Sequence, residues 1–285
     1  MARPRLPSID IIGDSHTVFF GAKKVAAATA RMGLSGAPFH TRVHLLQGAS
    51  LTGVRAYSSS LQIREKIDAV VKTADRLVLA LGQVDLELGF CYKQVIKKET
   101  WTPDGYVAYL TDIYRTFLET SDFGPCTLAL KGVNLTVLST PHFARAYVGR
   151  IITEGKPDDI GQAQAALDAA MLNERDQNDL HLSFNAKVAQ LAKQFGLGYF
   201  DLTSRLSARD DGGSPVMPAV LDRAHRPMKA DHHLLSSVAV YRHHYEALQQ
   251  TFGFSHGTDR HSPVMSDPHP TPSSHETSPH PQPAL

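Results

Sequence analysis

Residues 9–17 of the chain read Ile-Asp-Ile-Ile-Gly-Asp-Ser-His-Thr, and the interpretation of the whole sequence starts from this stretch. Its apolar beginning predicts a short buried strand, which ends at the turn-forming pair Gly13-Asp14. Apolar residues then recur at helical spacing from Val18 to Met32. Ser15 is therefore expected on a strand-to-helix turn at the carboxyl end of a strand, where open α/β sheets place their ligands.

Local sequence leaves two interpretations of Ser15 open. A helix that begins just after it directs backbone N–H groups and the positive end of its dipole at the same spot. Such a serine can act as a nucleophile, and its own N–H can stabilise an oxyanion. Alternatively, this is an ordinary helix N-cap, a position that both Ser and Asp favour.

The composition is that of a soluble globular protein. The 285 residues are 42% apolar and 20% charged, and 29 basic against 28 acidic side chains leave a net charge of +1. This balance argues against broad binding of nucleic acid or of an anionic membrane. Cys91 and Cys126 lie in no C-x-x-C pair and are expected to be free thiols. With no signal-peptide core and no apolar run approaching about 20 residues, a cytoplasmic protein is expected.

Further apolar runs predict four more strands, at 41–46, 77–81, 133–138 and 199–202. Helical patterns separate them, so the chain is expected to form a doubly wound, five-stranded parallel sheet with helices on both faces. This α/β domain is expected to span 1–254, with 143–176 as a cap or lid. The Pro-, Ser- and His-rich stretch 255–285 is expected to be a disordered tail.

Later motifs follow in a specific order. Gly48 comes after the second strand, Gly82-Gln83-Val84-Asp85 after the third, and Asp231-His232-His233 before the last helix. Together with Gly13-Asp14-Ser15 this order resembles the SGNH (GDSL-like) hydrolase superfamily, over roughly residues 8–250. The G-[E/Q]-V-D form of the third motif resembles divergent members associated with polysaccharide modification. The resemblance implies a flavodoxin-like three-layer α/β/α fold and ester or acyl-transfer chemistry, without a metal or other cofactor.

Roles for individual residues are implied by the same resemblance. Ser15 is the nucleophile, and its N–H and that of Gly48 are oxyanion donors. His233 is the preferred general base and His232 the alternative. Asp231 is the acid that orients the base.

Two departures from the superfamily pattern stand out. Val84 occupies the place of an Asn and has no side-chain donor, so Gln83, one position earlier, would serve only on an irregular backbone. No acid lies three residues before either histidine of the last motif. Asp231 must therefore act across a tight turn, or the acid lies elsewhere, or the site works as a Ser–His dyad.

The remaining polar residues near the predicted sheet edge have weaker interpretations. His142, after the fourth strand, either binds substrate or is an ordinary loop histidine. Asp85 either contacts substrate or, as we favour, holds loops together through backbone N–H groups. His16 is expected to point to solvent, and His243 and His244 to be partly exposed.

These observations lead to three functional hypotheses. The leading hypothesis is a serine esterase or O-acyltransferase that acts through an acyl-enzyme on a small-molecule or carbohydrate ester. A binding or scaffold protein on a degenerate hydrolase fold is the second, because the third-motif Asn is missing and the acid is displaced. A phosphate-binding protein that uses the helix after Ser15 is the third, and no glycine-rich phosphate loop supports it.

Overall fold

A computed structural model describes residues 6–55, 61–138, 141–153, 160–217, 219–228 and 231–255. For 141–144, 152–153 and 160–164 it describes the backbone alone. The tail expected over 255–285 lies outside the described residues except for Ser255. No helix among the described residues is both long and apolar enough to cross a membrane.

The elements, in chain order, are β1 (Ser8–Gly13), η1 (Ser15–Phe20), α1 (Ala22–Arg31), β2 (His40–Leu45), η2 (Leu51–Arg55), α2 (Ile63–Val71), β3 (Arg76–Ala80), η3 (Asp85–Gly89), α3 (Phe90–Val95), α4 (Pro103–Thr120), β4 (Thr127–Lys131), α5 (Pro141–Thr153), α6 (Ile160–Ala170), α7 (Glu174–Gln194), β5 (Gly198–Phe200), α8 (Thr203–Leu206), η5 (Arg223–His225) and α9 (Val238–Thr251).

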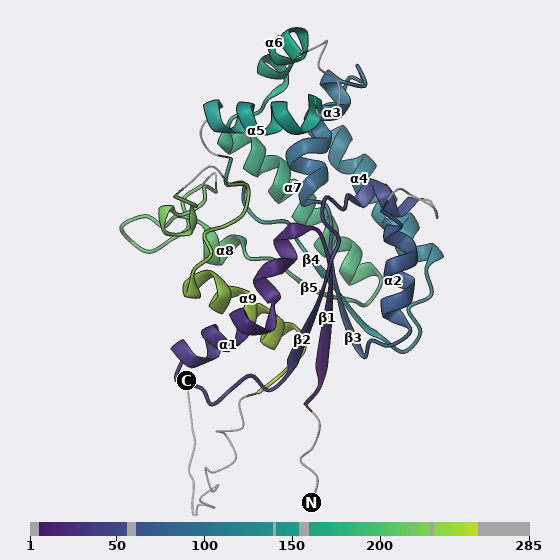
Figure 1. The fold of residues 1–285 in the computed structure, drawn as a ribbon, viewed down its shortest axis with the longest axis vertical. Coiled ribbons are helices and arrows are strands. Elements are labelled where there is room, and N and C mark those ends of the chain that lie inside the picture. The colour runs from purple at the N-terminus through teal and green to yellow at the C-terminus, as the bar shows by residue number, and fades with distance from the viewer. Residues whose placement is uncertain are drawn as a thin grey trace, which may run out of the picture. The chain divides into compact units, whose positions relative to one another are not determined.

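The five strands form one parallel sheet in the order β2-β1-β3-β4-β5 (Figure 1). The expected fold class is therefore confirmed. The chain runs from β1 to one neighbour, β2, and then crosses back to the other neighbour, β3. This reversal makes the carboxyl end of β1 the topological switch point, where doubly wound sheets form their binding crevice. Ser15 directly follows β1 at this point.

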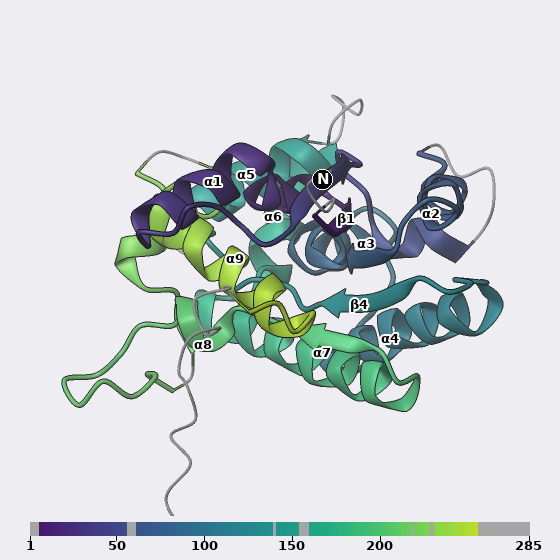
Figure 2. The same cartoon turned by 90° about the horizontal axis from the view of Figure 1, so that it is seen from below.

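Helices cover both faces of the sheet, as Figures 1 and 2 show from two directions. On one face α1 and α9 pack against Ile9, Ile11 and Val78. On the other face α2, α4 and α7 pack against Ile12 and Leu79. Successive strand residues point to opposite faces, so the continuous apolar run of β1 serves both cores at once.

The strand predicted at 133–138 is wrong. The fourth strand is β4, which ends at Lys131, and the chain beyond it is irregular. Side chains replace a neighbouring strand as partners of its backbone: the Val133 N–H donates to Asn185 Oδ1 at 2.7 Å and the Thr136 N–H to Asn178 Oδ1 at 2.8 Å. Both asparagines belong to α7, so an apolar run that reads as a strand is held by a helix instead.

Other elements are present with shifted ends. The helix expected across 18–32 is divided at Gly21 into η1 and α1. Helices α2, α4, α7 and α9 occupy places between and after the strands where helical patterns are expected. The expected cap segment contains α5 and α6, which lie beyond the carboxyl edge of the sheet in Figure 1. The structure does not test whether they move as a lid.

Candidate active site

The turn after β1 presents Ser15 at the sheet edge. Asp14, and not the serine, caps η1, because its carboxylate accepts the His16 N–H at 2.9 Å. The stretch thus contains the N-cap of the alternative interpretation, but Asp14 forms it, and the serine is the first residue of η1. Its side chain carries no capping bond, which leaves the hydroxyl available to a partner outside the turn.

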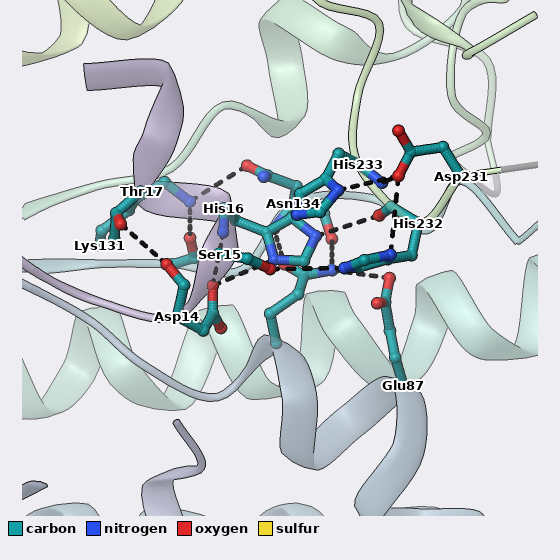
Figure 3. Close-up of polar contacts among 12 residues, drawn as sticks. Asp14, Ser15, His16, Thr17, Glu87, Lys131, Asn134, Asp231, His232 and His233 are labelled. Carbon is teal, nitrogen blue, oxygen red and sulfur yellow. Dashed lines mark hydrogen bonds and ion pairs between the residues drawn. The ribbon is translucent and has the colours of Figure 1, made fainter. Parts of the chain in front are cut away.

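That partner is a histidine from the far end of the described chain. The Ser15 hydroxyl oxygen lies 3.4 Å from His232 Nε2, across 217 residues of sequence (Figure 3). The contact is long, as contacts between nucleophile and base often are before substrate is bound. The structure thus brings Ser15 to the predicted histidine pair, but places His232, rather than the preferred His233, against the hydroxyl.

The turn formed by Asp231 explains why His232, and not His233, faces the Ser15 hydroxyl. Its Oδ1 accepts the His233 N–H at 3.0 Å and faces His233 Nδ1 at 2.8 Å. Aspartate commonly closes such a turn onto the backbone two residues later. His233 is therefore drawn back toward the carboxylate, and His232 projects toward Ser15. The same Oδ1 lies 3.6 Å from His232 Nδ1, a charge interaction longer than a hydrogen bond.

The environment keeps the His232 imidazole neutral at pH 7. Burial lowers its pKa to about 4, and the His233 and His16 imidazoles, when protonated, act in the same direction. Burial and His16 also lower the pKa of His233, although Asp231 opposes them. A neutral Nε2 can accept a proton, which is what a general base beside a serine hydroxyl must do.

His16 forms a buried ion pair directly beneath these rings. Only 5% of His16 and 2% of Asp14 are exposed, so the expectation that His16 points to solvent is wrong. Its Nδ1 donates to Asp14 Oδ1 at 3.0 Å and its Nε2 to the His232 carbonyl at 3.1 Å. Burial by itself disfavours the charged imidazole, but the Asp14 carboxylate outweighs it and raises the pKa of His16.

Two contacts restrain His232. The His16 ring anchors its backbone carbonyl, and the Tyr147 ring of α5 stacks on its imidazole with centroids 4.8 Å apart and planes 23° apart. Because a catalytic base must stay aligned with its proton donor, these contacts do for His232 part of what a hydrogen-bonded acid does elsewhere.

Two backbone donors are available for an oxyanion. The N–H groups of Ser15 and Gly48 donate to no protein acceptor within the described ranges. Gly48 has φ of +71°, a conformation that favours glycine. Gln83 does not join them: its Nε2 donates to Glu87 Oε1 at 2.9 Å and toward the Asn134 carbonyl at 3.3 Å. The structure therefore contradicts Gln83 as an oxyanion donor.

Asp85 holds the Gly48 loop in place. Its two carboxylate oxygens accept the N–H groups of Leu51 at 2.5 Å and Thr52 at 3.2 Å. Burial raises its pKa to about 6, and these N–H groups act in the opposite direction. With both oxygens occupied, Asp85 supports the loop instead of binding substrate. The side chain of His142, the other predicted substrate contact, lies outside the described residues.

A buried polar network under the site was missed by sequence reasoning. Asn134 donates its N–H to Gln83 Oε1 at 2.7 Å, and its carbonyl accepts His181 Nδ1 at 2.8 Å. Lys131 Nζ donates to Asn134 Oδ1 at 3.1 Å. Glu87 is 5% exposed, and burial raises its pKa to about 7. The one sequence signal was the spacing of Gln83 and Glu87, four residues apart on a helical turn.

Glu87→Gln is expected to change how stability depends on pH. Because the pKa of Glu87 is higher in the folded protein than in the unfolded chain, its contribution to stability is fully present at pH values below the unfolded-state pKa. This contribution is lost as pH rises toward 7, by at most about 1.4 kcal/mol per pH unit. The amide oxygen of Gln can still accept the Gln83 bond. Denaturant unfolding from pH 5 to 8 should show the variant gaining on wild type as pH rises. The exposed Glu119→Gln serves as control, and parallel curves for wild type and Glu87→Gln would refute the expectation.

One group of metal-ligating side chains is present among the described residues. Asp231, His232 and His233 place one ligand atom each within 4.8 Å of one another. Two of these donors already have partners, since His232 Nε2 faces Ser15 and His233 Nδ1 faces Asp231. That the site works without a metal stays a prediction.

A doubly wound α/β protein with a serine–histidine pair at its switch point is the class that fold and site define. No protein-family model and no curated protein matches this sequence. Among solved structures, the chain is similar to a GDSL-like lipase from Bacteroides thetaiotaomicron, with 12% identity, a TM-score of 0.48, and 89% of this chain and 92% of that one covered. It is also similar to the M. smegmatis aryl esterase, with 15% identity, a TM-score of 0.45, and 87% of this chain and 98% of that one covered. A third similar structure is an extracellular lipase from Streptomyces rimosus, with 12% identity, a TM-score of 0.38, and 86% of this chain and 99% of that one covered.

One of these three structures is named a GDSL-like lipase. With identities of 12–15% and TM-scores below 0.5, the likeness concerns the arrangement of elements. What the protein does is argued below from its own side chains.

Proposed function

We propose that this protein is a serine-dependent ester hydrolase or O-acyltransferase that acts through an acyl-enzyme, with Ser15 as nucleophile and His232 as general base. The observation that carries the proposal is the contact of Ser15 Oγ with His232 Nε2 at 3.4 Å. It lies at the switch point, where the turns after the neighbouring strands β1 and β2 carry the N–H groups of Ser15 and Gly48, which have no protein acceptor in the described part of the chain.

In the first half-reaction, His232 Nε2 takes the hydroxyl proton while Ser15 Oγ bonds to the acyl carbon. The N–H groups of Ser15 and Gly48 receive the developing oxyanion. The imidazolium then gives its proton to the ester oxygen as the bond from that oxygen to the acyl carbon breaks. Asp231 Oδ1, 3.6 Å from His232 Nδ1, stabilises the charged ring.

The second half-reaction decides between hydrolysis and transfer. Water that attacks the acyl-enzyme makes the protein an esterase, and a sugar hydroxyl makes it an O-acyltransferase. A carbohydrate acceptor is supported by the form of the Gly82-x-x-Asp85 motif, and α5 lies where it would control access of water.

The proposal is tested by labelling the full chain with a fluorophosphonate, which reacts with activated serines. We expect one adduct, on Ser15, that is lost in Ser15→Ala and retained in Ser204→Ala, which removes an exposed serine of α8. A folded wild-type protein without an adduct would reject the mechanism. It would favour a binding or scaffold protein, the alternative suggested by the missing side-chain donor at Val84.

On the acid side of the pH profile, kcat/KM should begin to fall only at an unusually low pH. The base must be unprotonated, and burial with two neighbouring imidazoles lowers the pKa of His232 to about 4. Activity on p-nitrophenyl acetate should therefore be retained down to about pH 5, below the ordinary range of histidine. His233→Ala removes one of the two neighbouring imidazoles that oppose protonation of His232, and it should move this fall in activity to higher pH. A fall in activity near pH 7 in the wild type would contradict this assignment of the base.

A further inference from the structure

A pocket of about 430 Å³ opens beside the candidate oxyanion site. Gly48 and Val84 line it at the sheet edge, and the rest of its wall comes mainly from η2, η3, α3 and α4. Nothing in the mechanism above uses this space. Its volume lies within the range of sites for small organic ligands.

The pocket wall carries an excess of positive charge. Three cations line it, and one of them, Lys93, is paired with Glu99 at 2.9 Å. Asp85 also lines it but is buried, with both oxygens bound to backbone N–H groups. Arg55 forms no ion pair with a described carboxylate, and Lys97 has only a longer-range charge interaction with Glu99; both cations are exposed. Two exposed cations without a close carboxylate favour an anionic ligand.

Aromatic rings accompany these cations. The Arg55 guanidinium lies 5.8 Å from the Tyr109 ring centroid, and Lys97 Nζ lies 5.8 Å from that of Tyr92. Leu88 and Ile151 add apolar surface to the same wall. The pocket therefore offers an apolar and aromatic wall with cations on it, which suits a short carbon chain that ends in a carboxylate.

Helix α5 connects this pocket to the reacting groups. Tyr147 stacks on His232, and Ile151, one helical turn later, lines the pocket. No histidine of the described part of the chain lines the pocket, whereas the leaving alcohol must receive its proton from His232. The alcohol therefore leaves on the imidazole side, and the acyl group extends past Gly48.

We propose that the pocket binds the acyl part of the substrate and that this acyl group ends in a carboxylate, as in a half-ester of a dicarboxylic acid. The inference rests on the proposed function and specifies its substrate class. Ser15 attacks the ester carbonyl, the alcohol leaves with a proton from His232, and the distal carboxylate stays bound near Arg55 and Lys97 throughout.

The test compares two esters of equal chain length, mono-p-nitrophenyl glutarate and p-nitrophenyl pentanoate. The wild type should prefer the glutarate ester in kcat/KM by about tenfold or more, as expected for charge-assisted bonds. Lys97→Gln and Arg55→Gln should each lower this ratio, Lys97→Glu should bring it to one or below, and added salt should weaken it. Lys72→Gln, an exposed lysine at the end of α2, should leave it unchanged.

A wild-type ratio near one, or a ratio insensitive to Lys97→Glu, would overturn the inference. So would an equal or stronger kcat/KM preference for 4-acetoxybenzoate, which carries its carboxylate on the alcohol, over the corresponding uncharged aryl acetate. A second measurement separates this inference from the proposed function: calorimetry of glutarate with Ser15→Ala, which should show binding that Lys97→Glu abolishes. Glutarate binding without any ester turnover in the wild type would reject the esterase and leave the anion pocket standing. Ser15-dependent turnover of pentanoate without glutarate binding would reject the pocket alone.

Discussion

His232→Ala is expected to lower kcat/KM for p-nitrophenyl acetate by about 1000-fold or more, the scale typical of a lost nucleophile–base pair. The reason is geometric, because His232 Nε2 faces the Ser15 hydroxyl at 3.4 Å whereas His233 Nδ1 is held by Asp231 at 2.8 Å. His233→Ala should cost much less, since it leaves the Ser15 contact in place and frees Asp231 for His232.

The comparison uses steady-state kinetics of His232→Ala and His233→Ala, together with Ser15→Ala and the Ser15→Ala/His232→Ala double variant. Serine and base act as a unit, so the double variant should be little worse than either single one. Circular dichroism and unfolding curves confirm that each variant is folded. A larger loss for His233→Ala than for His232→Ala would return the base to the histidine favoured from sequence. Wild-type-like activity of Ser15→Ala would remove the mechanism altogether.

Gly13→Ala is expected to destabilise the fold by about 3 kcal/mol or more, at or beyond the upper end of overpacking effects. A Cβ at this position would lie 2.0 Å from the Ala80 carbonyl oxygen, which belongs to the neighbouring strand β3. Backbone cannot rotate away as a side chain can, so β1 and β3 would have to separate at the switch point.

Gly21→Ala is the matched control for this prediction. At Gly21 an added Cβ meets only the Val18 carbonyl oxygen, at 3.4 Å, and φ is −60°. We therefore expect a small change there, in either direction. Urea unfolding of both variants gives the two free energies. If they are equally destabilised, the close approach of β1 to β3 is not what requires glycine.

Sequence patterns were sufficient for the sheet because each apolar run carries its own signal. Continuous runs such as 77–81 indicate strands buried on both faces, and glycine and polar residues at their ends indicate the loops. The run 133–138 misled for a physical reason: its backbone is paired by Asn178 and Asn185 of α7, and no local pattern reports bonds made from a distant helix.

The amino-acid sequence by itself determined the doubly wound α/β class, the place of Ser15 after β1, and the return of a histidine from the segment before α9. These follow from periodicity and chain order, which are local properties. Only the tertiary structure decided which histidine meets the hydroxyl, that His16 is buried with Asp14, and that the amide of Gln83 turns inward to Glu87. Those outcomes depend on how close the fold brings segments that lie up to 217 residues apart in the sequence. Burial at the site then determines which side chains bond to one another and which of them are charged.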